Sequence, residues 1–240
     1  MSSFRPRELI RSTAILSLFL CLTCILSSCN TPEPTPPAPA QSQSQPAPAP
    51  EPDPAPVPLT TEELEFFNSN SFFDNGGWGG INIRNQFLTS FYADPRNIDL
   101  FHLFYCGASQ DERTQEETHE ILSDIIAFVP FYPDAGCLIV TTQEMDQVLQ
   151  EHLGLTLEET NKVGLDTLTY LPQRDLYFHF HGDTNYGHMV HFTAGDQLGD
   201  TVRLYYQDTF GLLSGASCVL TLQKTGDSYR FLSNMPLPSN

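Results

Sequence analysis

Twelve of the 19 prolines in this chain lie between Asn30 and Pro58, and this cluster limits how much of the chain can fold. The segment alternates proline and alanine around the polar insert Gln41–Gln45 and shows no apolar periodicity. Such a composition cannot bury enough surface to offset the entropy lost on ordering, and its prolines favour polyproline II. We therefore predict a disordered tether at residues 29–58, which leaves residues 59–240 as the folding unit.

The charge balance of the chain excludes one class of partner. Its 240 residues include 29 Asp and Glu against 11 Lys and Arg, for a formal net charge of −18. Proteins that bind nucleic acids draw their affinity from clustered Lys and Arg, so we predict no nucleic-acid partner. The length that remains after the tether suits one domain with a substantial core.

The N-terminus has the pattern of an export signal. Arg5, Arg7 and Arg11 precede an apolar run of 13 residues, 14–26. A transmembrane helix needs about 20 apolar residues, so this run fits the apolar region of a signal peptide better than a permanent span. The run ends in Leu26-Ser27-Ser28-Cys29, which resembles the lipobox of bacterial lipoproteins.

The lipobox resemblance implies a processing step and a location. Residues 1–28 would be a lipoprotein signal peptide, and Cys29 would carry a diacylglyceryl group on its sulfur after cleavage. Two acyl chains give stable membrane attachment, whereas one chain anchors a protein only marginally. We expect a protein on the cell membrane, lipid-anchored and facing outside; an ordinary secretory peptide that leaves Cys29 as a thiol is the alternative.

Helical signals fill the first part of the folding unit. The Thr-x-x-Glu spacing of a capping box occurs at Thr60, Thr141 and Thr156 and predicts a helix start at each. Asp94-Pro95 marks a further start. The helices that we expect run from Thr60 through Phe67, over 81–92, 97–105 and 116–128, and onward from Thr141 and Thr156.

After Gly164 the sequence alternates as strands do. Leu176, Phe178 and Phe180 share one face of a strand, with Tyr177, His179 and His181 on the other. The same split recurs over 201–206 and 217–223, and Gly226-Asp227 signals a hairpin. We predict an α+β fold in which N-terminal helices pack on one face of a C-terminal antiparallel β-meander and leave its polar face open. A cone-shaped sheet, as in folds resembling nuclear transport factor 2, is one such arrangement.

Histidines concentrate at 179–191, where four of the seven occur, and His179-Phe180-His181-Gly182-Asp183 contains two potential zinc ligands on one strand face. If the strand pairs with its successor, His179 lies opposite His191, close enough to share an ion. The alternative is that these histidines line a solvated sheet face. An envelope metal-dependent hydrolase centred on His179, His181 and Asp183 therefore competes with a site that holds no metal, which we favour.

The function that we predict is binding rather than catalysis. No Gly-x-Ser-x-Gly elbow or phosphate-binding glycine loop occurs, and we predict no cofactor. The His179–Tyr186 stretch with Phe231–Asn234 is similar to uncharacterised bacterial lipoproteins, a resemblance that implies no known activity. We expect an envelope or extracellular ligand on the polar sheet face, at Tyr177, His179, His181, His191, Arg203 and Tyr205.

Three cysteines, Cys106, Cys137 and Cys218, follow the predicted cleavage site. An odd number in an oxidising compartment allows one disulfide with one buried thiol, or three buried thiols. Cys218 lies on the apolar face of its strand, which favours burial of that thiol.

Overall fold

The structure is a computed structural model that describes residues 54–70, 72–73, 82–108, 113–129, 136–181, 190–209, 211–213 and 215–238. All of these residues fall within one compact unit that spans residues 51–240. The predicted signal peptide and Cys29 lie outside the described residues. No helix in the described ranges is both long and apolar enough to cross a membrane.

Capping boxes start the main helices where the sequence predicts them. Thr60 and Thr141 each accept a hydrogen bond from the amide three residues on, and the carboxylates of Glu63 and Glu144 accept one from the cap amides. Cap interactions of this kind satisfy amides that the first helical turn leaves unpaired. The helices are α1 Thr61–Asn68, α2 Ile83–Gln86, α3 Leu100–Phe104, α4 Gln115–Phe128 and α5 Thr142–His152, with 3₁₀ turns η1 Pro95–Asn97, η2 Leu157–Glu159 and η3 Leu165–Thr167.

Three expected helices are wrong in length. The helix expected over 81–92 shrinks to α2, because Tyr92 leaves the helical path and exchanges two backbone hydrogen bonds of 2.9 Å with Asn234 of the sheet. The helix expected over 97–105 is divided between η1 and α3, which Asp94 and Asp99 cap separately. The Thr156 capping box starts only the short η2 turn.

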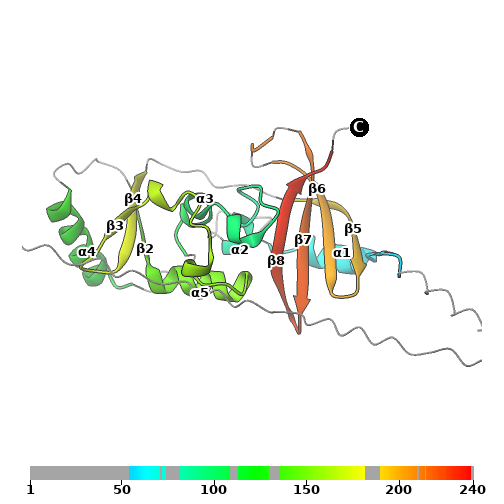
Figure 1. Cartoon of the computed structure of the whole chain (residues 1–240), viewed down its shortest axis with the longest axis horizontal. Coiled ribbons are helices and arrows are strands. Elements are labelled where there is room, and N and C mark those ends of the chain that lie inside the picture. The colour runs from blue at the N-terminus through cyan, green and yellow to red at the C-terminus, as the bar shows by residue number, and fades with distance from the viewer. Residues whose placement is uncertain are drawn as a thin grey trace, which may run out of the picture. The chain divides into compact units, whose positions relative to one another are not determined.

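The strands confirm an α+β fold but form two sheets rather than one. β5, β6, β7 and β8 make the predicted antiparallel meander, whereas β4 pairs with β2 and β3 in a separate sheet of order β2-β4-β3. In Figure 1 the small sheet lies at the left beside α4 and the large sheet at the right, with α2, α3 and α5 between them. The strands are β1 Val57–Pro58, β2 Gly136–Thr141, β3 Thr169–Leu171, β4 Leu176–His181, β5 Phe192–Leu198, β6 Thr201–Gln207, β7 Ser217–Thr225 and β8 Ser228–Pro236.

The folded chain begins slightly earlier than the sequence predicts. Val57 and Pro58, which we placed in the tether, form β1 and pair with Gln197 and Asp196 of β5. The adjacent Leu59 amide donates to the Gly195 carbonyl at 2.9 Å. β1 thereby completes the five-stranded order β1-β5-β6-β7-β8 and covers the edge of β5, a position where proline is tolerated.

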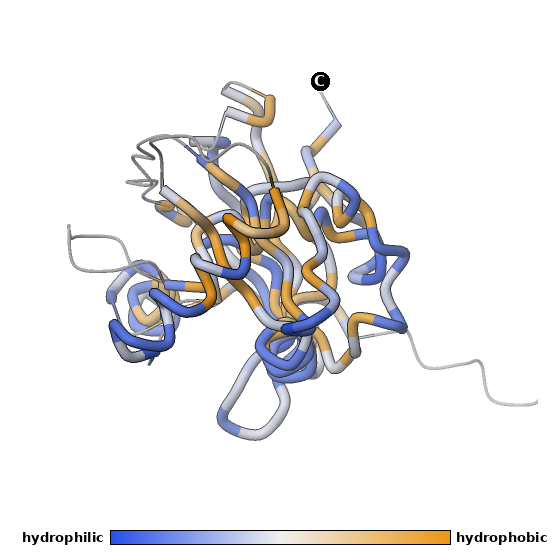
Figure 2. The backbone as a smooth tube through the Cα atoms, turned by 90° about the vertical axis from the view of Figure 1, so that its left-hand side faces the viewer, coloured by the Kyte–Doolittle hydropathy of each residue, from blue (hydrophilic) through white to orange (hydrophobic). Residues whose placement is uncertain are grey.

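Two hydrophobic clusters hold these layers together. In the smaller, Ile121 and Ile125 of α4 cover Leu176 and Phe178 on one face of the small sheet. In the larger, the inner face of the meander packs on helical residues, and Phe87 stacks on Phe231 with ring centroids 4.3 Å apart. Cys218 belongs to this larger cluster, and its predicted burial is confirmed. Figure 2 shows hydrophobic segments concentrated along the central strands and hydrophilic ones toward the outside.

Candidate functional site

The histidine face of β4 has the predicted alternation but different neighbours. His179 and His181 are only half-buried, and aromatic residues of the α3 region lie against them. The Phe101 ring lies 5.1 Å from the His179 ring, and the Tyr105 ring lies 5.2 Å from the His181 ring. Tyr177, on the same face, packs at the margin of the larger core cluster. The face that we expected to be open to ligands therefore turns toward α3 and the core.

The proposed pairing of His179 with His191 is wrong. β4 has β2 on one side and β3 on the other, and His179 lies opposite Leu138. His191 is exposed and precedes β5, which belongs to the other sheet. Asp183 lies outside the described residues. Among the residues that the structure does describe, no group of three His, Cys, Asp or Glu side chains is arranged to hold a metal ion.

Arg203 and Tyr205 lie on the outer face of the meander, as predicted, and share one carboxylate. Arg203 Nε donates to Asp196 Oδ1 at 2.7 Å, and the Tyr205 hydroxyl donates to Asp196 Oδ2 at 2.8 Å. Partial burial raises the pKa of Tyr205, and its bond to Asp196 raises it further. These three groups satisfy one another on a partly exposed face of the sheet. The six predicted ligand residues are thus divided: three lie on β4 of the small sheet, two on β6 of the large sheet, and His191 precedes β5.

A pocket of about 720 Å³ runs along α5 instead, and the sequence analysis missed it. Its wall on α5 follows the helical spacing of Glu144, Gln147, Val148, Glu151 and His152. At a rise of about 1.5 Å per residue, the distance along the helix axis from the first to the last is about 12 Å. The remaining lining residues come from α2 and its cap and from the segment that leads into α4: Asn82, Ile83, Arg84, Ala108, Arg113 and Glu117.

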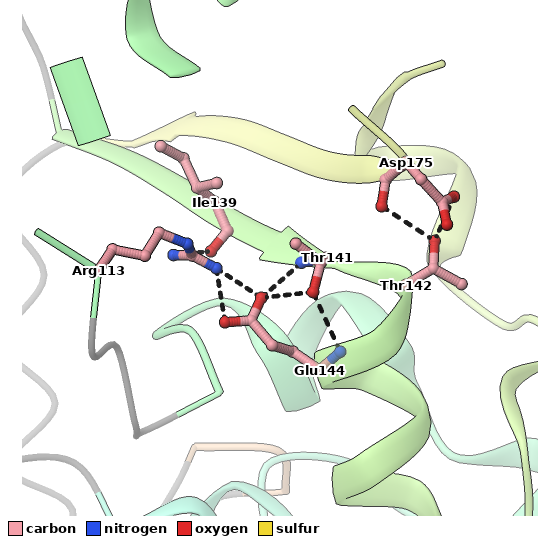
Figure 3. A network of polar contacts seen from close by, with 6 residues as sticks. All are labelled: Arg113, Ile139, Thr141, Thr142, Glu144 and Asp175. Atoms are coloured by element: carbon pink, nitrogen blue, oxygen red, sulfur yellow. Dashed lines mark hydrogen bonds and ion pairs between the residues drawn. The ribbon is translucent and has the colours of Figure 1, made fainter. Parts of the chain in front are cut away.

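The end of the pocket near the start of α5 is a fixed network of charges (Figure 3). Arg113 Nη2 donates to both oxygens of Glu144, at 2.6 and 2.5 Å, and Arg113 Nη1 donates to the Ile139 carbonyl at 3.3 Å. Glu144 Oε2 also accepts from the amide and hydroxyl of Thr141, at 2.6 and 2.9 Å. The Glu144 carboxylate therefore both caps α5 and binds Arg113, and these bonds fix the positions of the two side chains.

Glu117, on α4, is similarly engaged. Its carboxylate accepts from the Thr114 amide at 2.8 Å and from the Thr114 hydroxyl at 2.9 Å. These hydrogen bonds, the backbone one foremost, lower the pKa of Glu117. The carboxylates of Glu117 and Glu144 are therefore held in place as hydrogen-bond acceptors, because each accepts the bonds of its helix cap.

The other end of the pocket contains a buried histidine beside an arginine. His152 is 4% exposed, and its ring packs edge-on against the rings of Phe87 and Phe231 at 5.3 and 6.1 Å. Burial lowers the pKa of His152 to about 4, although Glu151 opposes this shift and Arg84 adds to it. Its Nε2 lies 3.7 Å from Glu151 Oε1, too far for a hydrogen bond. His152 is therefore a neutral imidazole at pH 7.

Arg84 is held at this end by contacts that leave its charge unbalanced. The guanidinium lies 4.8 Å from the centroid of the Phe72 ring, a cation–π contact, and Nη1 donates to the Phe72 carbonyl at 3.4 Å. The Arg84 amide donates to the cap oxygen of Asn82 at 2.9 Å. In the described part of the chain, no carboxylate forms an ion pair with Arg84.

Comparison with known proteins gives no family: no protein-family model, curated protein or solved structure matches the chain. The pocket could have been anticipated only in part. The residues on α5 follow a helical period that the Thr141 capping box places correctly, but nothing in the sequence indicates that α2 and the start of α4 face this stripe.

Proposed function

We propose that the protein is a lipid-anchored binding module displayed outside the cell membrane by its Pro-rich tether. The lipobox at Leu26–Cys29 and the composition of residues 30–58 support this location. At about 3.1 Å per residue in polyproline II, a stalk of this kind would extend up to roughly 90 Å. The conical curvature that we expect of the sheet is part of the same proposal. The ligand would be a small solute rather than a membrane or a nucleic acid.

The observation that carries the binding role is the polar pocket along α5. Ligand sites are concave and combine a few fixed polar groups with apolar walls, and this pocket has both, with Val148 and Ile83 beside its charged residues. The Asp196, Arg203 and Tyr205 side chains already bond one another, which leaves fewer of their polar atoms for a small molecule. We therefore place the ligand site along α5 in preference to the sheet face.

The charged groups of the pocket favour binding over acid–base catalysis. A catalytic acid or base needs a pKa near the working pH and freedom to exchange its proton. Glu117 has a lowered pKa because it caps α4, and Glu144 both caps α5 and binds Arg113. His152 has its pKa lowered to about 4 by burial. These groups suit hydrogen bonding to a ligand whose own charge does not change.

Location and binding are tested separately. For location, Cys29→Ala in the full chain should move the protein from the membrane fraction to the soluble fraction, whereas Cys24→Ala should not. A Cys29→Ala chain that stays in the membrane fraction through washing with detergent-free buffer would refute the lipid anchor.

For binding, Gln147→Trp should fill the pocket, and Gln150→Trp, on the same helix but outside the lining, is the matched control. A ligand found by thermal shift should lose its stabilising effect in the first variant and keep it in the second. Equal stabilisation of both variants would place the ligand elsewhere.

A further inference from the structure

The pattern of ion pairs sets Arg84 apart from the other basic residues. Basic side chains are scarce in this acidic chain, and the described ones mostly pair with a carboxylate, as in Arg96–Asp94, Arg113–Glu144, Lys162–Glu158, Arg174–Asp124 and Arg203–Asp196. Lys224 and Arg230 have no such partner among the described residues, but both are exposed and solvated. Arg84 is half-buried and faces a pocket.

The guanidinium of Arg84 has donors to spare. It carries five N–H groups, and within the described residues one of its nitrogens meets an acceptor, the Phe72 carbonyl, at a long 3.4 Å. A cation that is partly removed from water without a counter-ion is unfavourable, and an anion that reaches it gains charge-assisted hydrogen bonds. Its contacts with the Phe72 ring and carbonyl hold the guanidinium at the pocket before any ligand arrives, which reduces the entropy lost on binding.

The end of the pocket away from Arg84 favours hydrogen-bond donors on a ligand rather than negative charge. Glu117 and Glu144 line the end of the pocket away from Arg84, and an ionised carboxylate offers only acceptors; Glu151 lies beside His152, nearer Arg84. Anionic parts of a ligand would be repelled by Glu117 and Glu144, whereas hydroxyl groups can donate to their oxygens. His152 adds a neutral imidazole beside Arg84, and Gln147 an amide between the two ends.

We propose that the pocket along α5 binds a sugar acid, with the ligand carboxylate on Arg84 and its hydroxyl groups on Glu117 and Glu144. This inference rests on the proposed function, because it assigns a ligand class to the same pocket. The roughly 12 Å length of the α5 stripe accommodates a carboxylate at one end and a polyhydroxyl body along the rest. A neutral sugar would leave the Arg84 guanidinium without an anionic partner.

The test compares two probes of one shape on the full chain: D-glucuronate and D-glucose, each titrated by calorimetry at pH 7.5 in millimolar amounts. Glucuronate should bind at least about tenfold more tightly than glucose, because only its carboxylate can form charge-assisted hydrogen bonds with Arg84. Equal affinities for glucuronate and glucose, or no binding of glucuronate, would overturn the proposal.

Variants of Arg84 assign the effect to one residue. Arg84→Gln should weaken glucuronate binding about tenfold or more, and Lys224→Gln, which removes the same charge from an exposed site, should leave it unchanged. Arg84→Lys keeps the charge without the planar fork and should bind at intermediate strength, which guards against a folding defect in the glutamine variant. Glucuronate affinity in Arg84→Gln equal to that of the parent chain would refute the role of this side chain.

The same variants separate this inference from the function on which it rests. If another solute stabilises the protein, loses its effect in Gln147→Trp and is indifferent to Arg84→Gln, the pocket is a binding site and the sugar-acid assignment is wrong. If every bound solute is indifferent to Gln147→Trp, the pocket itself is not the binding site.

Discussion

The buried His152 should make the stability of the protein depend on pH in a window set by its two pKa values. In the unfolded chain the imidazole has its ordinary pKa of 6.5, and in the folded protein burial lowers the pKa to about 4. Between these values the unfolded state binds a proton that the folded state does not, so acid favours unfolding. The contribution of His152 to the free energy of unfolding is therefore fully present above pH 6.5 and is lost as the pH falls toward 4.

The magnitude follows from the size of the pKa shift. Each pK unit corresponds to about 1.4 kcal/mol, so the shift is worth about 3 kcal/mol in total, of which about 2 kcal/mol should be lost between pH 7 and pH 5. This conversion is appropriate because His152 is only 4% exposed, and water therefore screens it little.

The assay is urea unfolding of the parent chain and of His152→Gln at both pH values. Titrating carboxylates also destabilise the protein in acid, but they do so in both chains, so the difference between the chains isolates the histidine. Any advantage of the parent over the glutamine variant at pH 7 should shrink by about 2 kcal/mol at pH 5. A difference that is the same at both pH values would refute the reasoning and would place His152 in contact with water.

Two further predictions concern the packing around the sheet. Asn234 is fully buried, accepts from the Tyr206 hydroxyl at 2.7 Å and donates to the Ser90 carbonyl at 3.0 Å. Asn234→Ala should lower the free energy of unfolding by about 2–4 kcal/mol, because it leaves two buried groups unpaired. A decrease below about 1 kcal/mol in urea unfolding would contradict this. Gly164 and Gly199 both have positive φ, but a β-carbon at Gly164 would lie 2.5 Å from a carboxylate oxygen of Asp99, whereas one at Gly199 meets nothing within 4 Å. Both substitutions to alanine add backbone strain of about 1 kcal/mol, but only Gly164→Ala adds a clash with Asp99, the residue that caps α3. Gly164→Ala should therefore lower the melting temperature more than Gly199→Ala does. Equal shifts in melting temperature would show that Asp99 moves away freely.

Local signals predict most helix starts and strand faces, although the Thr156 capping box starts only a 3₁₀ turn, and they do not predict pairing between distant segments. The capping boxes at Thr60 and Thr141 act within one turn, so the sequence contains all that decides them. Alternation in β4, β6 and β7 likewise gave the right division of faces. Alternation cannot say which strand lies alongside, however, and β4 pairs with β2, an apolar stretch that the sequence analysis did not identify as a strand.

The common sheet face that we predicted for the ligand residues fails for the same reason. His179 and Arg203 have the same strand pattern in sequence, and that pattern suggested a common face, but β4 and β6 belong to different sheets. The sequence does not predict a role for Arg84, because an isolated arginine belongs to no motif. Its interest comes from the lack of a paired carboxylate among the described residues, and that can be known only after the positions of acidic side chains in space are known.

The attachment of β1 to the edge of β5 would have a mechanical consequence if the protein is tethered as we propose. Tension applied along the N-terminal segment would reach the domain at Val57 and Pro58, where the pairing is only two residues long. Peeling these residues and Leu59 from β5 would release about 10 Å of slack at roughly 3.3 Å per residue, while α1 and the rest of the sheet stayed folded. β1 would then detach from β5 under tension and pair with it again when the tension falls, before force reaches the pocket along α5.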